Sequence, residues 1–569
     1  MSHPLWTLAE VLAATGGHLD LPSKKTGGPE GIPPARCGAG PADREAVISG
    51  VSIDTRSLTL GDLFVPLIDV RDGHDFVTAA FERGATAALV RDGYQRMPGD
   101  GALIRVHDTL AALGRLGVAA RARLAPSAHV IAVTGSAGKT GTKEMLRACL
   151  KVCASSPDKV HAPEKSFNNH WGVPLTLARM PADTEFAVFE IGMNHAGEIR
   201  PLVKMVRPEI AIVTNVLPVH VGNFPDGEIG VANAKAEIFE GLEAPREVTP
   251  RRSSFVQGES HSTSDSSPLP LMGRGRGWGD NANSRPEIIP PPLTPPRKGE
   301  GDKAEQVMLM RGTAIILRDN PHYERLRAAA QTRGAAVVTF GRDPDADVRL
   351  SSLEIGTSAR QADVGVAVRL RRPRTNAVKE IEFDIGMFGR HLATNALAVI
   401  AALDVLGCDI DRATRELALV KSAAGRGARE FVGASGAEIL LLDESYNANP
   451  ASMAAALATL SQIQDPAIKA KIAVLGDMLE LGADSVRYHL GLKDAAARAD
   501  LVFCCGPHMK HLFDSLPAEK QGRYAPTSGE LIPFVLEALG PGDAVMVKGS
   551  LGSRMAPIVD AIKKRFAGV

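Results

Sequence analysis

The chain has 569 residues and carries 65 Lys and Arg against 65 Asp and Glu, so its formal net charge is zero. Single hydrophobic cores stop growing near about 250–300 residues, so this length predicts several domains. Zero net charge provides no overall basic field to favour nucleic acid or an anionic membrane. The longest apolar runs are shorter than the roughly 18 residues of a membrane span.

The N-terminal residues lack a basic segment followed by an apolar run, so no secretory signal peptide is expected. Six cysteines are too few for a disulfide framework in so long a chain, and they form no cluster with zinc-ligand spacing. We therefore expect reduced thiols, a cytoplasmic location and, by default, a monomer.

The first part of the chain predicts a small α/β unit. Residues 5–20 suggest a short helix and turn, and residues 22–43, rich in Gly and Pro, suggest an irregular loop. Short strand and helix patterns then alternate through residues 47–90. Thr55, Arg56 and Ser57 directly follow a strand, where hydroxyls and a guanidinium can bind a phosphate; a capped turn with a surface arginine is the alternative.

A β-branched run at 130–134 leads into a glycine turn and then a helical pattern. The turn reads Gly135-Ser136-Ala137-Gly138-Lys139-Thr140. Backbone N–H groups of such a turn, with the N-terminus of the next helix, bind phosphate oxygens. Lys139 is then expected to bridge the outer phosphates of ATP and Thr140 to ligate Mg²⁺. Val133 stands where the full motif has glycine, so an ordinary strand–helix turn is the alternative.

Three further stretches of this central region carry candidate groups. Glu190 ends a buried-type strand and can position Mg²⁺, or it can cap the next helix. His220 follows another strand, and Lys235 lies on a predicted helix. Taken singly, these two are an ordinary loop histidine and a solvated lysine. Residues 244–305 are rich in Ser, Gly, Arg and Pro and cannot offset their ordering entropy by burial, so they predict a disordered insertion.

The C-terminal part predicts a doubly wound parallel sheet, with strands near 438–443, 471–476, 501–504 and 544–548. Polar motifs follow three of these strands, and open α/β sheets bind ligands at those strand ends. The motifs begin at Asp443, Gly476 and Lys548. Three such clusters are hard to explain as helix capping.

The motifs together resemble the Mur ligase family, the ATP-dependent amide-bond ligases of peptidoglycan precursor synthesis. They are Thr-Gly-Ser-x-Gly-Lys-Thr at 134–140, Asp-Glu-Ser-Tyr-Asn-Ala-Asn-Pro at 443–450, Leu-Gly-Asp-Met-x-Glu-Leu-Gly at 475–482 and Lys-Gly-Ser-x-Gly-Ser-Arg-Met at 548–555. The resemblance runs from about Val47 to the C-terminus, apart from the insertion. The last three motifs resemble most the member that joins D-alanyl-D-alanine to a UDP-N-acetylmuramoyl-tripeptide.

The resemblance implies three α/β domains. Residues 1–125 would form a small domain that binds the UDP-sugar-peptide, and 126–420 a P-loop ATPase-like parallel-sheet domain that holds the insertion. Residues 421–569 would form a Rossmann-like domain. The implied mechanism has a substrate carboxylate attack the γ-phosphate of ATP, and an amine then displace phosphate from the acyl phosphate.

The resemblance also assigns roles to individual residues. Lys139, His220 and Lys235 would be catalytic, and Thr140, Glu190, His220 and Lys235 would serve Mg²⁺, with Lys235 open to carbamylation. ATP would contact 135–140, Asn169, Asp443 and Asn447. The UDP-sugar-peptide or the dipeptide would contact Thr55, Arg56, Ser57, Asn168, Asn447, Asn449, Lys548 and Ser550.

Two departures stand out. Leu317 occupies the position of a family asparagine near the adenine, and Gly141 replaces a hydroxyl residue after Thr140. Another amide ligase of this fold, such as a folylpolyglutamate-type enzyme, is the nearest alternative. A weakly catalytic nucleotide-binding scaffold is the alternative from a different class.

Overall fold

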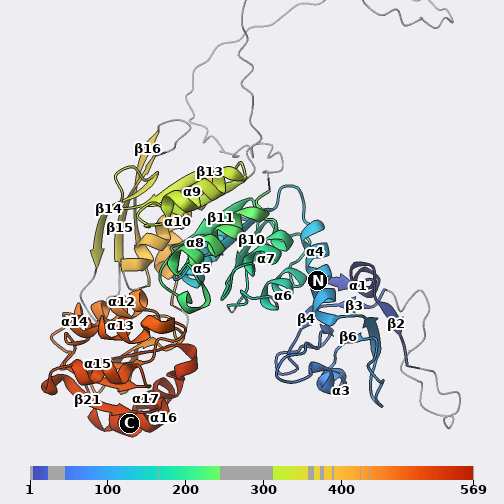
Figure 1. The fold of residues 1–569 in the computed structure, drawn as a ribbon. Coiled ribbons are helices and arrows are strands. Elements are labelled where there is room, and N and C mark those ends of the chain that lie inside the picture. The colour runs from blue at the N-terminus through green and yellow to red at the C-terminus, as the bar shows by residue number, and fades with distance from the viewer. Residues whose placement is uncertain are drawn as a thin grey trace, which may run out of the picture. The chain divides into compact units, whose positions relative to one another are not determined.

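The computed structural model describes residues 4–22, 45–164, 166–243, 312–355, 364–371, 377–387, 390–422, 424–434 and 436–567. Their strands form three α/β sheets and one two-stranded pairing (Figure 1). The α/β class predicted from the sequence is confirmed. The insertion predicted at 244–305 and most of the predicted loop at 22–43 lie outside the described residues.

The N-terminal sheet has the strand order β2-β7-β6-β5-β4, in which β4 to β7 run parallel and β2 pairs antiparallel with β7. Its strands are β2 (His18–Asp20), β4 (Gly50–Ser52), β5 (Asp62–Phe64), β6 (Ala87–Arg91) and β7 (Ala102–Val106). The helices are α1 (Leu8–Thr15), η1 (Gly73–Phe76), α3 (Val77–Glu82) and α4 (Thr109–Ala122). The short strands β1 (Trp6–Thr7) and β3 (Val47–Ile48) pair antiparallel, so the predicted helix-and-turn at 5–20 also contains strand residues.

The central sheet has nine strands in the order β16-β15-β14-β13-β12-β11-β8-β10-β9. These are β8 (His129–Thr134), β9 (Val160–His161), β10 (Phe186–Glu190), β11 (Ile210–Val213), β12 (Thr313–Leu317), β13 (Ala336–Gly341), β14 (Val348–Ile355), β15 (Val364–Arg371) and β16 (Val378–Ile385). Strands β8 to β14 pair parallel, whereas β14, β15 and β16 pair antiparallel. The parallel part was predicted; the antiparallel extension was not.

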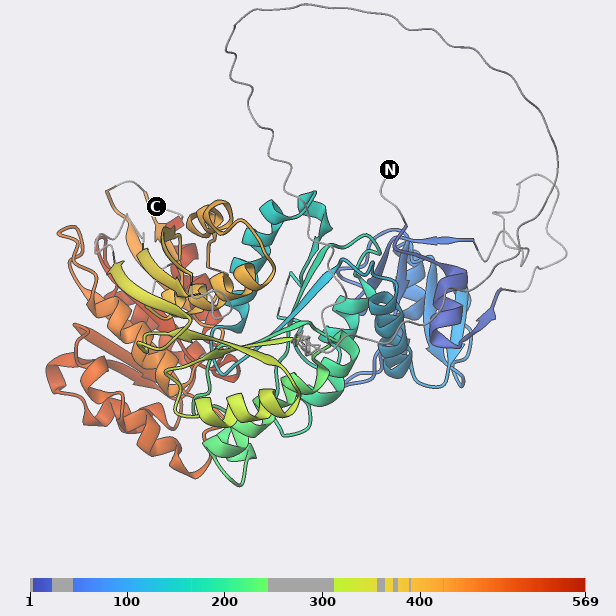
Figure 2. The same ribbon diagram turned by 90° about the horizontal axis from the view of Figure 1, so that it is seen from above.

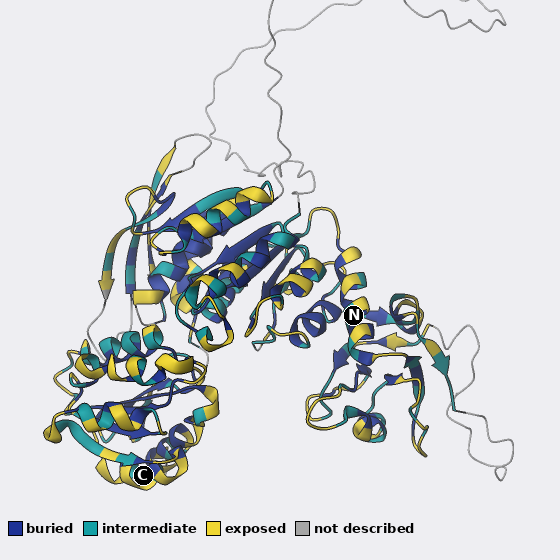
Figure 3. Ribbon diagram, in the orientation of Figure 1, coloured by how far each residue is buried: buried dark blue, intermediate teal, exposed yellow. Residues whose placement is uncertain are grey.

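Helices cover both faces of the central sheet (Figure 2). They are α5 (Lys139–Cys153), α6 (Gly172–Ala178), α7 (Ile199–Val206), α8 (Glu228–Ala236), α9 (Tyr323–Thr332), α10 (Arg390–Val405) and α11 (Ile410–Thr414), with 3-10 turns η2 (Pro157–Lys159), η3 (Val221–Asn223), η4 (Glu237–Gly241) and η5 (Arg415–Leu419). Successive β8 side chains enter opposite cores, Val130 and Ala132 one and Ile131 and Val133 the other. Burial on both faces explains why these strands are continuously apolar (Figure 3).

The C-terminal sheet has the order β17-β18-β22-β19-β20-β21. Its strands are β17 (Ala428–Val432), β18 (Ile439–Glu444), β19 (Lys471–Gly476), β20 (Leu501–Cys505), β21 (Gln521–Ala525) and β22 (Ala544–Lys548). The helices are α12 (Pro450–Ser461), α13 (Ser485–Leu490), α14 (Lys493–Ala496), α15 (Met509–Ser515), α16 (Ser528–Ala538) and α17 (Ala556–Ala567), with η6 (Gly482–Asp484), η7 (Ala518–Lys520) and η8 (Leu551–Ser553). The four predicted strands are present, and only β17 runs antiparallel.

The residues that flank the insertion lie in contact. A Cβ on Gly312 would come within 2.8 Å of the Glu243 carbonyl oxygen. Glu243 N–H donates to Pro208 O (2.9 Å), and Thr313 N–H donates to Glu209 O (2.7 Å). Both chain ends are therefore anchored at the start of β11, and the ordered sheet does not depend on the length of the segment between them.

Within the described residues, no helix is long and apolar enough to cross a membrane, and no disulfide links the cysteines. The domain boundaries near residues 125 and 420 stay predictions.

Candidate functional site

The glycine turn predicted to bind phosphate joins β8 to α5. Gly135 (φ 151°) and Gly138 (φ 84°) adopt backbone conformations that other residues rarely take, and Gly138 is the N-cap of α5. Lys139 begins the helix, and its Nζ donates to Gly135 O (2.7 Å). Burial lowers the pKa of Lys139, with Glu190 acting in the opposite direction. The first turn of α5 therefore points its N–H groups and a lysine toward one place, as an anion site requires.

Glu190 ends the neighbouring strand β10 and is 1% exposed. Thr140 Oγ1 donates to Glu190 Oε2 (2.8 Å), and Asn168 Nδ2 donates to Glu190 Oε1 (2.7 Å). These contacts bring three predicted site residues together from three separate segments. A buried carboxylate and a hydroxyl beside a phosphate loop are oxygen ligands of the type that Mg²⁺ takes alongside substrate phosphates.

Ser166, which was not among the predicted site residues, joins this group. Its hydroxyl lies 3.1 Å from Thr140 Oγ1 and accepts from Arg426 Nη2 (2.9 Å). The Arg426 guanidinium also lies 4.0 Å from the ring centroid of Tyr446. Arg426 and Ser166 are 260 positions apart in the chain, so no local pattern shows that their side chains meet.

His220 and Lys235 follow β11. His220 has a left-handed backbone (φ 59°), and its Nδ1 contacts the carboxylate of Glu480, itself left-handed (φ 63°). Burial lowers the pKa of His220, against the opposing effect of Glu480. Lys235 on α8 is 3% exposed, and burial lowers its pKa well below the usual value, with Lys139 adding to the shift. Lys235 is therefore not a solvated lysine, whereas His220 is a loop histidine with a carboxylate partner.

Asn168 and its neighbour Asn169 point their side chains to different partners. Asn169 Oδ1 accepts from the N–H groups of Gly172 (2.9 Å) and Trp171 (3.2 Å) at the start of α6. Asn169 thus shapes the loop that presents Asn168 to Glu190, and its contact with ATP stays a prediction.

The predicted ligand-binding residues of the C-terminal sheet make most of their hydrogen bonds within their own loops. Asp443 accepts from Gly425 N–H (2.8 Å) and from the Ser445 hydroxyl (2.6 Å), and Asn449 caps α12. Asn447 is exposed, and its Oδ1 accepts from the N–H of the next residue. Of these three predicted ligand-binding residues, Asn447 has the most accessible side chain.

Lys548 and Ser550 are buried behind the same loop. Lys548 Nζ donates to Glu444 Oε2 (3.1 Å) and to Asn447 O (2.9 Å), and Ser550 Oγ accepts from Leu479 N–H (2.9 Å). The two side chains tie the three polar motifs to one another. Their contact with substrate stays a prediction.

In the N-terminal sheet, Thr55, Arg56 and Ser57 form an exposed turn after β4. Arg56 pairs with Asp54 through its Nη2 (2.7 Å), and Ser57 Oγ donates to Asp54 O (3.2 Å). A phosphate would have to compete with Asp54 for this guanidinium.

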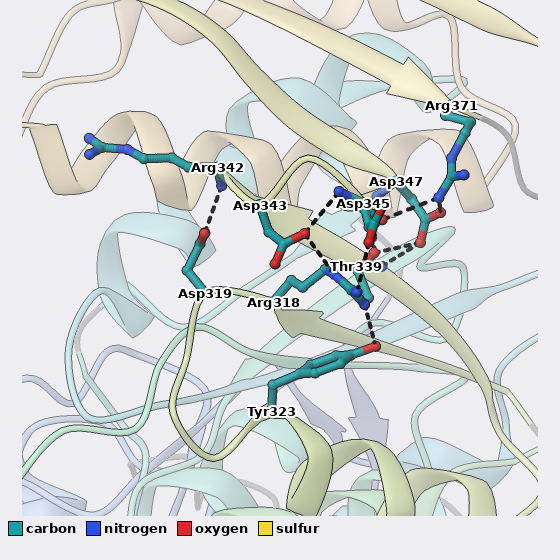
Figure 4. Close-up of polar contacts among 9 residues, drawn as sticks. All are labelled: Arg318, Asp319, Tyr323, Thr339, Arg342, Asp343, Asp345, Asp347 and Arg371. Carbon is teal, nitrogen blue, oxygen red and sulfur yellow. Dashed lines mark hydrogen bonds and ion pairs between the residues drawn. The ribbon is translucent and has the colours of Figure 1, made fainter.

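A polar cavity of about 600 Å³ lies beside α9, β12 and β13, away from the phosphate loop. Arg318 Nε donates to Asp343 (3.0 Å), its Nη1 donates to the Tyr323 hydroxyl (3.3 Å), and Arg371 reaches Asp347 (3.2 Å) (Figure 4). These polar groups bond to one another. Leu317, just before Arg318, has no side-chain amide to offer an adenine, and it packs against an apolar core.

Comparison with known proteins identifies the family. Residues 133–260 and 304–403 match the Mur ligase middle domain, and residues 429–551 match the Mur ligase glutamate ligase domain. A protein of Escherichia coli (strain K12) named UDP-N-acetylmuramoyl-tripeptide--D-alanyl-D-alanine ligase is 31% identical over 91% of this chain and 95% of its own length. The chain belongs to the Mur ligase family.

Other Mur ligases agree with this assignment. The ligase of the same name from Rickettsia prowazekii is 29% identical over 90% of this chain and 94% of its own. A crystal structure of MurF from Acinetobacter baumannii has a TM-score of 0.69 at 25% identity and covers 99% of both chains. MurF ligase from Thermotoga maritima, solved in complex with ADP, has a TM-score of 0.63 at 20% identity and shares the fold.

One further residue of this Mur ligase faces the phosphate loop. Asn395 of α10 is 3% exposed, and its Nδ2 has no hydrogen-bond partner among the described residues. A Cβ on Gly138 would lie 2.5 Å from that nitrogen. No local pattern indicates this contact, because it depends on the packing of α10 against α5.

Proposed function

We propose that this enzyme joins D-alanyl-D-alanine to UDP-N-acetylmuramoyl-tripeptide, converts ATP to ADP and phosphate, and so makes the UDP-N-acetylmuramoyl-pentapeptide used for peptidoglycan. The observation that carries this function is the match of relatives with that activity in their names across nine-tenths of the chain. The retained phosphate loop with Glu190 beside it supports it. We also propose that the enzyme is cytoplasmic and monomeric.

The residues around Gly138 fit the phosphates of ATP. The N-terminus of α5 offers N–H groups, Lys139 offers a cation, and the unpartnered Asn395 Nδ2 offers a further donor. Buried donors without partners are costly, so the orphaned amide beside the loop supports a bound acceptor there. The Lys139 ammonium has three N–H donors, so its bond to Gly135 O leaves donors for a phosphate.

The residues around Glu190 fit Mg²⁺. Thr140 and Glu190 would hold the ion together with phosphate oxygens, and His220 and Lys235 would serve a second ion. No group of three or more His, Cys, Asp or Glu side chains among the described residues could hold a metal by itself, which agrees with ions bound partly by substrate. Bound Mg²⁺ would supply charge neutralisation during phosphoryl transfer.

Lys235 is suited to carbamylation. Its lowered pKa favours the uncharged amine, which is the form that attacks CO₂. The amine nitrogen bonds to the carbon of CO₂, one C=O π bond opens, and the nitrogen releases a proton, so the uncharged amine becomes an anionic carbamate with oxygen ligands. We propose this modified form for the working enzyme.

The reaction takes place in two substitution steps. The terminal carboxylate of the tripeptide attacks the γ-phosphorus, the bond to the β,γ-bridging oxygen breaks, and ADP leaves. The amine of D-alanyl-D-alanine then attacks the acyl carbon, phosphate leaves, and the extra proton passes to solvent. Lys139 and Asn395 hold the phosphates in line, which is the main contribution a protein makes to phosphoryl transfer.

The remaining candidates are proposed to bind the two other substrates. Thr55, Arg56 and Ser57 would take the UDP end, and Asn168 would lie near the reacting carboxylate. The exposed Asn447, with Asp443, Asn449, Lys548 and Ser550 ordering its loop, would face the nucleotide and the dipeptide.

The test is phosphate release from ATP by the purified enzyme with Mg²⁺, omitting each substrate in turn. We expect release to require D-alanyl-D-alanine and UDP-N-acetylmuramoyl-tripeptide, with diaminopimelate or lysine as third residue, and to match pentapeptide formation. A different amino acid requirement would favour another amide ligase. Nucleotide binding without release, using either tripeptide, would favour a scaffold.

A further inference from the structure

Three polar side chains at the carboxyl ends of β11 and β12 have no part in the reaction proposed above. They are Thr214, Asn215 and Asn320. Thr214 is 1% exposed and Asn320 is 6% exposed. Most buried polar groups in proteins are hydrogen-bonded, so the partners of these groups indicate what they do.

Asn215 bonds to two successive residues of the phosphate loop. Ser136 N–H donates to the Asn215 carbonyl oxygen (3.0 Å), and Ala137 N–H donates to Asn215 Oδ1 (2.9 Å). Thr214 Oγ1 donates to Ala137 O (2.6 Å) and fills the space that a side chain at Gly135 would need. The residues that follow β11 thus bind the turn at 135–137 on its backbone and fix its conformation.

This bonding divides the loop into two parts. The N–H groups of Ser136 and Ala137 donate to Asn215, so in this conformation the N–H groups left for a phosphate are those of the following turn, from Gly138 to Thr140. Without the Asn215 acceptor, Ala137 N–H would turn to water, and ATP would have to order the loop as it binds. Ordering on binding weakens affinity.

Asn215 is itself held in place. The next residue, Val216, accepts from Asn320 Nδ2 through its carbonyl oxygen (3.0 Å). Leu217 donates its N–H to Ser136 Oγ (2.9 Å) and accepts from the same hydroxyl (3.1 Å). The segment therefore has anchors on both neighbouring strands, and Asn215 has a fixed place from which to hold the loop.

We propose that Asn215 is a positioning residue for ATP, which holds the phosphate loop in its binding conformation through Ala137 N–H. It acts through the loop and does not contact the nucleotide. This inference rests on the proposed use of ATP.

The experiment compares Asn215→Leu, which removes the acceptor at similar size, with the wild type. Asn215→Ala is a second variant in case Leu does not fold. Asn223→Ala is the matched control, because Asn223 lies on the same connection but bonds to Asn194 O (3.1 Å) and not to the loop. Equilibrium binding of a fluorescent ADP analogue with Mg²⁺ should weaken about tenfold in the Asn215 variants, of the order of one lost hydrogen bond. The control should bind as the wild type does.

A second measurement separates positioning from general damage. Amide hydrogen exchange at Ala137 in the ligand-free protein should speed up in Asn215→Leu and stay slow in Asn215→Asp, which keeps the acceptor. Wild-type nucleotide affinity in both Asn215→Leu and Asn215→Ala, or unchanged exchange at Ala137, would overturn the inference. If the wild type itself binds no nucleotide, the proposed function fails, and the exchange at Ala137 still decides whether Asn215 holds the loop.

Discussion

Replacing Glu190 with Gln removes one negative charge from the proposed site and leaves its shape almost unchanged. The carboxylate accepts from Thr140 Oγ1 (2.8 Å) and from Asn168 Nδ2 (2.7 Å). In Glu190→Gln, Oε1 can keep the bond from Asn168, and the new Nε2 can donate to Thr140. The Thr140 hydroxyl can then donate to Ser166 Oγ, which lies 3.1 Å away.

The expected effects on stability and on activity differ in size. Two charge-assisted bonds become neutral, which costs about 1 kcal/mol each, and Lys139 loses the attraction of Glu190. These losses are offset because a carboxylate that is 1% exposed no longer has to be desolvated, which costs several kcal/mol. The free energy of unfolding of the ligand-free variant should therefore stay within about 2 kcal/mol of the wild-type value. Turnover should fall by about 100-fold or more, because an anionic oxygen beside the phosphates is lost.

Urea denaturation without ligands and the phosphate-release assay measure the two effects. Glu209→Gln is the control. Glu209 contacts His129 (2.5 Å) at the amino end of β11, whereas Glu190 lies at the carboxyl end of its strand. It should keep most of its activity. Wild-type activity in Glu190→Gln, or a loss of more than about 2 kcal/mol of stability, would refute the reasoning that this charge serves the ligand and not the fold.

Three other predictions follow from the same geometry. Lys139→Met should abolish turnover and weaken binding of the fluorescent ADP analogue, while UDP-N-acetylmuramoyl-tripeptide still binds; retained turnover would contradict the phosphate role. Deletion of residues 250–300 should leave most activity, because the residues on either side of the insertion lie in contact; a folded but inactive deletion would count against this. Burial lowers the pKa of His161 from 6.5 to about 4, and its Nε2 donates to Thr176 O (2.8 Å). The unfolded chain therefore takes up the proton first as pH falls below about 6.5, so stability present above that pH should decline toward pH 4. In His161→Gln, urea midpoints should lose part of this decline, and an unchanged decline would exclude His161 as its source.

Local patterns predicted the elements that hold the phosphate loop. The apolar run of β8, the glycine turn and the start of α5 are adjacent in the chain, and their conformations depend on neighbouring residues. The antiparallel extension β14–β16 was missed, although β15 alternates buried and less buried residues, because the region was read only as α/β. Strand β17 was missed as well.

The C-terminal motifs show where sequence reasoning cannot separate two roles. Asn449 and Asp443 are residue types that commonly bind ligands. In this structure Asn449 caps α12, and Asp443 accepts a hydrogen bond from the turn at Gly425. Asparagine and aspartate serve caps and ligands through the same acceptor oxygens. Only exposure distinguishes them, and exposure is a property of packing.

The sequence by itself determined the family, the α/β class, the phosphate loop and the presence of Glu190 at a strand end, since each lies in a short continuous pattern. The tertiary structure alone decided which side chains meet. Strand β8 lies between β10 and β11. The carboxyl ends of β10 and β11 therefore bring Glu190 and Asn215 to opposite sides of the phosphate loop that follows β8. Those residues are separated by 50 and 78 positions from their loop partners Thr140 and Ala137. Contacts between residues so far apart in the chain depend on the order of the strands in the sheet. That order is determined by the burial of whole strands, and no local sequence pattern encodes it.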